Sequence, residues 1–262
     1  MRTTHASRVG FGVFIGLVLT FLFLPLALMI LFAFNNSPRL TFPMHGLSLR
    51  WFSGLLHDDE FLASFRRTIM VAVATALGSG ILALLGALGL VRLGPRVRAV
   101  ALTFTAIPLA FPLLLYAVGL AFFYHQIGIG FSLWATIAGH IVLAIPFCFL
   151  VIGAALERFR FSLLEAARDL GAGGFYAFRT VTLPNILPAV IGSMLLAAAL
   201  SADEFVIAFF TAGQDKTLPM LLYGRLNLGV TPALNAVGVV LLVLTTGLAL
   251  FAARRTSRQE TQ

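Results

Sequence analysis

Residues 71–90 read VAVATALGSGILALLGALGL, a stretch of twenty residues without a charged side chain. About twenty apolar residues form a helix long enough to cross the roughly 30 Å hydrocarbon layer of a membrane. A strand of a membrane barrel would be about ten residues long with alternating polarity, and this stretch does not alternate. Backbone N–H and C=O groups cannot remain unpaired in lipid, so the stretch predicts a transmembrane helix.

The composition extends this interpretation to the whole chain. Of its 262 residues, 60% are hydrophobic and 11% are charged, whereas soluble domains are about half apolar and a quarter charged. The net charge of +8 comes mainly from arginines at the ends of apolar stretches, where they act as topology signals rather than as a nucleic-acid patch. The single cysteine, Cys148, excludes an intrachain disulfide and is expected to be a small buried side chain. Intrinsic disorder and a solvent-exposed catalytic domain are excluded.

Five further stretches have a similar length and polarity, so we expect an all-α integral membrane protein with six transmembrane helices. The predicted spans cover residues 9–34, 68–91, 99–123, 133–156, 186–210 and 232–253. The first is longer than the apolar core of a signal peptide and lacks a small-residue cleavage pattern, so we expect it to be retained. The predicted organisation is one transmembrane domain, residues 9–253, between the short terminal segments 1–8 and 254–262.

The distribution of basic residues predicts the orientation in the membrane. If the amino terminus is inside, the inner segments hold twelve basic residues and the outer segments hold six. This asymmetry follows the positive-inside rule, so both termini are expected in the cytoplasm. The inner segment 157–184 is the most polar part of the chain. The outer segment 35–67 carries Trp51 and Phe52 beside polar residues, which is typical of an interfacial helix or a docking surface.

The chain lacks the motifs of an ATPase or of a common hydrolase. The phosphate-binding pattern GxxxxGK[ST] is absent, and the single lysine, Lys216, follows Asp215. The histidines do not have the HExxH zinc spacing, and no serine lies in GxSxG. If the protein moves a solute uphill, the energy must come from a partner or from an ion gradient.

Residues 162–172 read SLLEAARDLGA and predict a short amphipathic helix in the inner segment. Ser162 and Glu165 have the spacing of a capping box at the helix start, and Gly171 is a suitable stop. The residues expected on its apolar face are Leu163, Ala166, Ala167 and Leu170, whereas Glu165, Arg168 and Asp169 are expected toward the other. Such a helix is too short to span a membrane and too polar to enter lipid, so we expect a protein partner on its exposed side.

This loop resembles the EAA loop of binding-protein-dependent ABC importer permeases, in which EAA precedes three residues, a glycine, nine residues and I-x-L-P. The matching residues are Glu165, Ala166, Ala167, Gly171, Leu183 and Pro184, with Val181 in place of isoleucine. In that family the loop forms a coupling helix that fits a groove on the ATPase subunit. The resemblance therefore implies the type I ABC importer permease (MetI-like) fold. It also implies the ATPase-coupling residues Glu165, Ala166, Ala167, Asp169 and Gly171.

Other segments look like the second permease subunit of spermidine/putrescine importers. They are residues 34–35, 48–52, 201–207, 218–219 and 230–236, together with His140 before Ile145 and Pro146. The chain departs from that family at Arg66 and Arg67, where relatives often have a small polar pair. The resemblance implies a multi-pass protein of the bacterial inner membrane that forms half of a translocation path for a small cationic amine.

The same resemblance implies the partners of the chain. They are a second homologous permease, two cytoplasmic ATPase subunits that bind ATP and magnesium, a periplasmic substrate-binding protein and the surrounding membrane lipid. No cofactor, metal or nucleic acid is expected on this chain itself.

Four polar residues within the predicted spans are candidates for the translocation path: Asp203, Glu204, Tyr116 and His140. A carboxylate in a membrane costs about 2.5–3.5 kcal/mol on insertion scales unless it faces water or a partner. Asp203 and Glu204 therefore either meet the ammonium groups of an amine or form an interfacial pair, solvated or bonded to a neighbouring subunit. Since consecutive helical residues point about 100° apart, at most one faces squarely into the path. His140 is either a substrate or proton-linked group or a helix–helix hydrogen-bonding residue, and Tyr116 lines the path or belongs to the interfacial aromatic belt.

Three alternatives remain open from the sequence. The same machinery would serve ferric iron, thiamine, a phosphonate, sulfate or molybdate, although positive groups would suit an anion better than Asp203 and Glu204 do. A membrane-embedded enzyme would need a nucleophile–base pair or a metal cluster, and His140 has no obvious partner in the sequence. A proton-driven carrier would need charged relay groups near the midplane, which the predicted spans lack.

Overall fold

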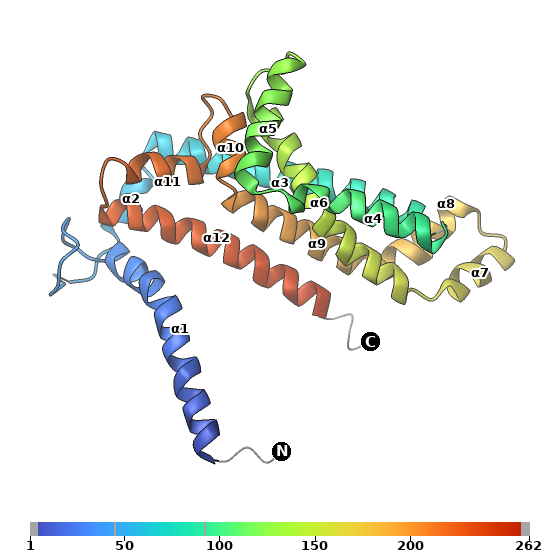
Figure 1. The fold of residues 1–262 in the computed structure, drawn as a ribbon, viewed down its shortest axis with the longest axis horizontal. Helices are drawn as coiled ribbons and strands as arrows, with labels where there is room; N and C mark the ends of the chain where they lie inside the picture. Colours follow the sequence, from blue (N-terminus) through green and yellow to red (C-terminus); the bar gives the residue numbers. More distant parts are fainter. Residues whose placement is uncertain (1–4, 45, 92, 258–262) are drawn as a thin grey trace. The chain divides into compact units, whose positions relative to one another are not determined.

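The computed structural model describes residues 5–44, 46–91 and 93–257, and every regular element within them is helical (Figure 1). The elements are α1 (His5–Ala33), α2 (Arg50–Leu55), α3 (Asp59–Leu90), α4 (Pro95–Ala110), α5 (Leu113–Gln126), α6 (Leu133–Arg158), α7 (Phe161–Asp169), α8 (Gly174–Ala177), the π-helical turn η1 (Phe178–Thr182), α9 (Leu183–Asp203), α10 (Val206–Thr211), α11 (Leu218–Leu226) and α12 (Pro232–Ser257).

Within the part of the chain that the structure describes, five helical segments are long and apolar enough to cross a membrane. They are Gly10–Ala33, Asp59–Leu90, Leu133–Arg158, Gly174–Asp203 and Pro232–Ala253. The predicted class, a helical multi-pass membrane protein, is confirmed.

The predicted third span, residues 99–123, is divided into two helices. The helices α4 and α5 meet at a bend of 97°. Phe111, at the end of α4, has an extended backbone, and Pro112 immediately precedes α5. Proline cannot donate a backbone hydrogen bond and disfavours helical geometry in the residue before it, which explains the end of α4 at Ala110. The pair makes a sixth span only if its two halves cross the membrane together.

The predicted fifth span, residues 186–210, also has different ends in the structure. The continuous helical segment runs over Gly174–Asp203, and a separate helix, α10, follows it. The π-helical turn η1 lies immediately before Pro184 in the first turn of α9, where proline cannot take part in the regular pattern of hydrogen bonds. The helical part of this segment therefore begins inside the polar segment 157–184 and ends at an acidic residue.

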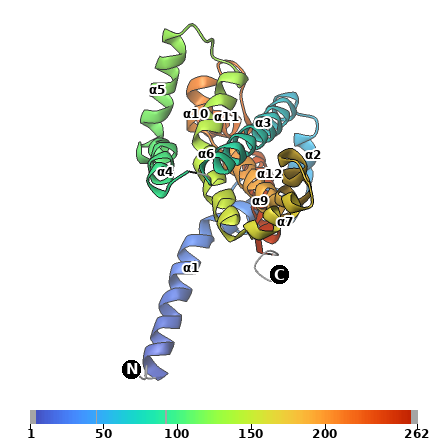
Figure 2. The same ribbon diagram turned by 90° about the vertical axis from the view of Figure 1, so that its right-hand side faces the viewer.

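The described chain divides into two compact units, of which the larger comprises residues 63–221 and 243–257. Within it, α3, α6 and α9 lie side by side (Figures 1 and 2). They share a buried hydrophobic core that contains Cys148. Small residues let these helices approach closely, since a Cβ atom at Gly80 would lie 2.3 Å from Met194 Cγ. Cys148 is 0% exposed, which confirms the prediction of a small buried side chain.

The smaller unit comprises residues 5–62 and 222–242. Its polar-aromatic segment after α1 forms the six-residue helix α2. Trp51 at the start of α2 donates a hydrogen bond from Nε1 to the Asn35 carbonyl at 2.7 Å. Asn35 is 0% exposed, so this tryptophan anchors α2 to the backbone that leaves α1.

Candidate functional site

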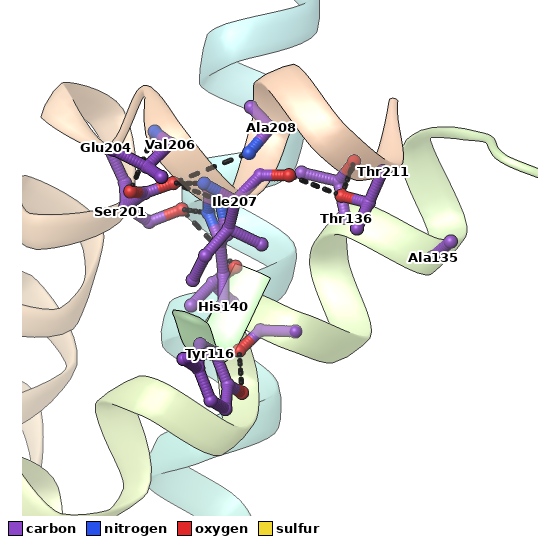
Figure 3. A network of polar contacts seen from close by, with 12 residues as sticks. Tyr116, Ala135, Thr136, His140, Ser201, Glu204, Val206, Ile207, Ala208 and Thr211 are labelled. Carbon is purple, nitrogen blue, oxygen red and sulfur yellow. Dashed lines mark hydrogen bonds and ion pairs between the residues drawn. The ribbon is translucent and has the colours of Figure 1, made fainter. Parts of the chain in front are cut away.

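Helix α9 ends at an acidic pair, Asp203 and Glu204. The Glu204 carboxylate accepts three backbone N–H groups at the start of α10 (Figure 3). These donors belong to Val206 at 2.9 Å, Ile207 at 2.8 Å and Ala208 at 3.3 Å. A helix start leaves such N–H groups without a partner in the helix. Glu204 therefore caps α10 and stabilises the break between the two helices.

His140 of α6 lies against the same carboxylate (Figure 3). Its Nε2 atom is 3.2 Å from Glu204 Oε2, the distance of an ion pair if the imidazole is protonated, but the geometry is not that of a hydrogen bond. On the other side of the ring, Nδ1 is 2.7 Å from Ser201 Oγ, and this hydroxyl donates to Thr75 Oγ1 at 3.3 Å. The side chains of His140 and Glu204 are only 2% and 7% exposed. A buried chain of polar groups thus links α3, α6, α9 and the start of α10.

A cavity of about 710 Å³ lies beside this chain of polar groups and is lined mainly by apolar side chains of α4, α6, α9 and α12. Its polar and charged lining residues are His140, Ser201, Asp203, Glu204, Thr245 and Thr246. No arginine or lysine of the described chain belongs to the lining. Ligand sites commonly combine an apolar wall with a few convergent polar groups, and here the fixed charges are both carboxylates.

The structure places the four predicted path residues in three different environments. Asp203 is exposed and lines the cavity, and its side chain has no hydrogen bond or ion pair with another described residue. Glu204 and His140 also line the cavity but contact each other. Tyr116 lies outside the lining, and its hydroxyl donates to the Gly139 carbonyl at 3.0 Å. The structure thus brings together three of the four residues.

Sequence reasoning did not find the small hydroxyl residues of this site. Thr75 and Ser201 extend the polar chain, while Thr245 and Thr246 line the cavity. Serine and threonine are common in membrane helices because they bond to backbone carbonyls or between helices. Only their places in the folded structure, in a contact between α3 and α9 or in the cavity lining, distinguish these four from the other hydroxyl residues of the spans.

The polar segment 157–184 contains the predicted amphipathic helix, but its start differs from the prediction. Helix α7 begins at Phe161, and no side chain caps its first N–H groups. The predicted capping box of Ser162 and Glu165 is therefore wrong. The Phe161 ring packs edge to face on Phe159 with their centroids 5.3 Å apart, so aromatic packing on the end of α6 positions the start of α7.

The predicted end of this helix at Gly171 is confirmed. Gly171 has a φ of +85°, a left-handed conformation that favours glycine. Its N–H donates to the Arg168 carbonyl at 2.8 Å, and the Ala172 N–H donates to the Ala167 carbonyl at 3.0 Å. These two bonds form a Schellman motif, which satisfies carbonyls at the end of α7.

The exposed face of this loop carries charged and apolar groups without partners in the described chain. Glu165, Ala166 and Asp169 are exposed and Ala167 is half-buried. Neither Glu165 nor Asp169 bonds to another described residue. Large apolar side chains that follow α7 are also exposed: Leu170 at 91%, Phe175 at 77% and Tyr176 at 65%. Large exposed apolar side chains near unpaired charges are a feature of protein–protein surfaces.

Arg168 lies apart from the acidic residues of α7 with which the sequence grouped it. It lines a second cavity of about 680 Å³ together with Phe161 and Leu164 of the same helix. The remaining lining residues come from α3, α6, α8 and η1. Glu165 and Asp169 are therefore the charged residues of α7 that remain for an outside partner.

The described chain thus combines long apolar helices around a polar break with an amphipathic helix in the polar segment 157–184. Residues 79–258 match the family described as "Binding-protein-dependent transport system inner membrane component". The chain belongs to this family and is a transport permease rather than an enzyme.

Two curated relatives are similar over most of their length. The chain is 30% identical over 234 residues to the spermidine/putrescine transport system permease protein PotC of Escherichia coli (strain K12), covering 89% of this chain and 88% of PotC. It is 36% identical over 241 residues to the putrescine transport system permease protein PotI of the same strain, covering 85% of this chain and 82% of PotI. The predicted resemblance to this group of permeases is confirmed.

Solved structures of importers share the fold. A chain of a bacterial ABC transporter involved in the import of the acidic polysaccharide alginate aligns with a TM-score of 0.70 at 16% identity, covering 97% of this chain and 96% of that chain. A chain of the MetNI methionine ABC transporter aligns with a TM-score of 0.58 at 20% identity, covering 77% and 98%. The permease fold predicted from the inner loop is confirmed.

Proposed function

We propose that this chain forms half of the translocation path of an ATP-driven importer for small cationic amines of the putrescine and spermidine type. The observation that carries the proposal is the cavity beside the end of α9, whose fixed charges are the two carboxylates Asp203 and Glu204. An amine combines ammonium groups with a hydrocarbon chain, which matches carboxylates set in an apolar wall. The similarity to PotC and PotI, named for these cargoes, supports the same assignment.

The proposed assembly contains a second homologous permease, two cytoplasmic ATPase subunits and a periplasmic binding protein. The ATPases would bind ATP and magnesium, because this chain lacks the phosphate-binding motif. We place residues 9–253 in the bacterial inner membrane as one permease domain of six spans, with α4 and α5 together as the third. Both termini are cytoplasmic by the distribution of basic residues.

The proposed docking surface for one ATPase is the exposed face of α7 together with the turn that follows this helix. Glu165, Ala166, Ala167 and Asp169 supply the contact residues, and Gly171 supplies the turn. The exposed Leu170, which is 91% accessible, adds an apolar anchor of the kind that protein interfaces bury. Asp203 and Glu204 contact the cargo, with His140 beside them, and Tyr116 supports α6 through its bond to the Gly139 carbonyl.

Uptake into proteoliposomes tests the cargo. The complete transporter, reconstituted with its binding protein and internal ATP regeneration, should accumulate labelled putrescine or spermidine. It should not accumulate sulfate, molybdate, a phosphonate, ferric iron or thiamine. Accumulation of one of these cargoes without amine uptake would keep the importer class and overturn the amine assignment.

A further inference from the structure

The second cavity lies where three long helical segments begin or end. Leu88 belongs to the last turn of α3 and Leu156 to the last turn of α6, while Gly174 begins the helical segment Gly174–Asp203. The ends of membrane-spanning helices lie near the lipid head groups. This cavity of about 680 Å³ therefore lies where the hydrocarbon meets the polar surface of the membrane.

One charged side chain of the described chain lines this cavity. It belongs to Arg168, and no acidic residue of the described ranges takes part in the lining. Leucine, valine and phenylalanine side chains form most of the wall, with Thr182 as a further polar group. Arg168 is exposed, and its guanidinium has no hydrogen bond or ion pair with another described residue. Since arginine remains protonated in proteins, the cavity combines an unpaired positive charge with an apolar wall.

Helix α7 carries this positive charge apart from its acidic residues. Phe161, Leu164 and Arg168 line the cavity, and their spacing of three and four residues places them on one face of the helix. Glu165 and Asp169 lie outside the lining. The helix thus contributes an arginine to the cavity and leaves its two carboxylates on the exposed face.

The apolar wall continues along α3 beyond the cavity. Leu85 lies one turn before Leu88 on the same face of this helix, and it is 62% exposed. Phe161, which lines the cavity from α7, is 42% exposed. Exposed apolar side chains that adjoin one another mark contact with a membrane or with a partner. A hydrocarbon chain that enters the cavity therefore has a continuous apolar surface along α3.

We propose that this cavity binds an anionic phospholipid, with its phosphate group on the Arg168 guanidinium and an acyl chain against the apolar wall. A guanidinium binds two phosphate oxygens through parallel hydrogen bonds. Basic pockets between membrane helices on the cytoplasmic side bind anionic head groups. A free phosphate would pair with Arg168 but would leave the apolar wall without a partner, so a lipid matches both parts of the cavity.

This site is separate from the cargo cavity and goes beyond the proposed function. It requires that the segment 157–184 lies at a membrane surface, and it is independent of the cargo. Because α7 carries Glu165 and Asp169 on its exposed face and Arg168 in the cavity, the lipid would lie behind the proposed docking surface. The bound lipid would therefore position the docking helix.

Photo-crosslinking of lipid tests the site. The complete transporter is reconstituted in phosphatidylcholine vesicles that contain traces of phosphatidylglycerol with a diazirine in its acyl chain. After illumination, mass spectrometry measures the labelling of the peptides that line the cavity, in comparison with the same analogue of phosphatidylcholine. We expect the anionic analogue to label these peptides about tenfold more strongly, and Arg168→Gln to abolish this preference.

The chain offers matched controls for both parts of the site. Arg179 is an exposed arginine of the same segment outside the lining, so Arg179→Gln should keep the preference. Gly174 lines the cavity and has open space where a Cβ atom would be, so Gly174→Leu should lower labelling by both lipids. Gly173 is equally open but lies outside the lining, and Gly173→Leu should be labelled like the wild type. The glycine pair replaces Arg168→Gln if that variant does not assemble.

Equal labelling of the wild type by the two lipids, or equal losses in Arg168→Gln and Arg179→Gln, would overturn the lipid site. Loss of labelling in excess inorganic phosphate would reveal an anion site without an acyl chain and would contradict it as well. Weaker ATPase binding by Arg168→Gln with unchanged labelling would assign the cavity to the partner instead. Labelling needs no cargo, so absence of amine uptake by the same vesicles would contradict the proposed function alone.

Discussion

Helix α9 is flanked by two polar regions that use their charges in opposite ways. In the loop before it, Glu165 and Asp169 are exposed and bond to no other described residue. At its other end, the side chains of Glu204 and His140 are buried and lie 3.2 Å apart. Glu204 accepts backbone N–H groups of α10, and His140 Nδ1 lies 2.7 Å from Ser201 Oγ. Buried polar groups are normally satisfied within a protein. We therefore expect the loop to act through an outside partner and the break to act on what enters the cavity.

The largest expected effect concerns the sides of the membrane on which the two regions lie. A cysteine at Gln214, in the exposed turn after α10, should react fully with an impermeant thiol reagent added to intact cells. A cysteine at Thr180, in the inner loop, should react only after the membrane is opened. Cys148 is fully buried and gives little background. The reverse labelling pattern would overturn the orientation derived from the basic residues.

The next effect is on coupling to ATP hydrolysis. Gly171→Val places a β-branched residue at a φ of +85°, which costs roughly 1–3 kcal/mol and disrupts the turn that ends α7. We expect substrate-stimulated ATP hydrolysis to fall about tenfold or more, with the chain still inserted in the membrane. Glu165→Lys should act in the same direction by reversing a contact charge.

The matched control for this variant is Gly173→Ala. Gly173 lies two residues further on with a φ of −64° and open space where a Cβ atom would be. Its substitution should leave coupling near the wild-type level. Equal losses at Gly171 and Gly173, or undiminished coupling in both Gly171→Val and Glu165→Lys, would contradict the role of the Schellman turn and the docking surface.

A smaller effect is expected on stability, and it should separate the two regions. Ser201→Ala removes the hydroxyl beside His140 Nδ1 and leaves this buried ring nitrogen without its hydrogen-bond partner, which costs about 1–3 kcal/mol. Glu165→Gln changes an exposed residue without a partner in the described chain and should alter stability by less than about 0.5 kcal/mol. Thermal unfolding of the purified permease in detergent compares the two. A larger loss for Glu165→Gln would mean that the loop also supports the fold.

The smallest effect is expected on the stability that one ion pair contributes. This pair lies outside both regions and serves as a control. Arg225 pairs with Asp58 at 2.7 Å. Burial raises the pKa of Asp58, but hydrogen bonds from Phe61 and Arg225 more than offset this, so the pKa lies below its ordinary 3.8. The pair therefore contributes stability above that value, and the contribution disappears as the pH falls through the lower folded-state pKa.

Arg225→Gln should accordingly destabilise the permease by less than about 1 kcal/mol at neutral pH, since such ion pairs contribute little. The difference between wild type and variant should shrink as the pH is lowered below 3.8. Unfolding midpoints measured at several pH values check this. A difference that grows in acid would show that Asp58 has the opposite shift.

Sequence reasoning predicted the features that depend on neighbouring residues. The apolar run over residues 71–90 became part of α3, and Gly171 ended α7 as its spacing indicated. The start of α7 was predicted wrongly because packing of Phe161 on Phe159 is a tertiary contact. The break at Pro112 divided an apolar stretch that hydropathy alone reads as one helix.

The site at the end of α9 was predicted only in part for the same reason. Asp203 and Glu204 were conspicuous as charges in an apolar span, but their different environments depend on the end of the helix between them. The partners of His140 lie 61 and 64 residues away, at Ser201 and Glu204. No local pattern of residues indicates that His140 lies beside Ser201 and Glu204 in the folded chain.

The central claim is that the carboxylates at the end of α9 attract a cationic cargo. It is tested most directly by putrescine uptake with the double variant Asp203→Asn, Glu204→Gln in proteoliposomes. An ammonium 4 Å from a carboxylate gains about 4 kcal/mol at an effective dielectric constant of 20, before the cost of removing water from both groups. Neutralisation should therefore lower the uptake rate about tenfold or more in complexes that assemble normally. Uptake by the double variant at the wild-type rate would contradict the claim.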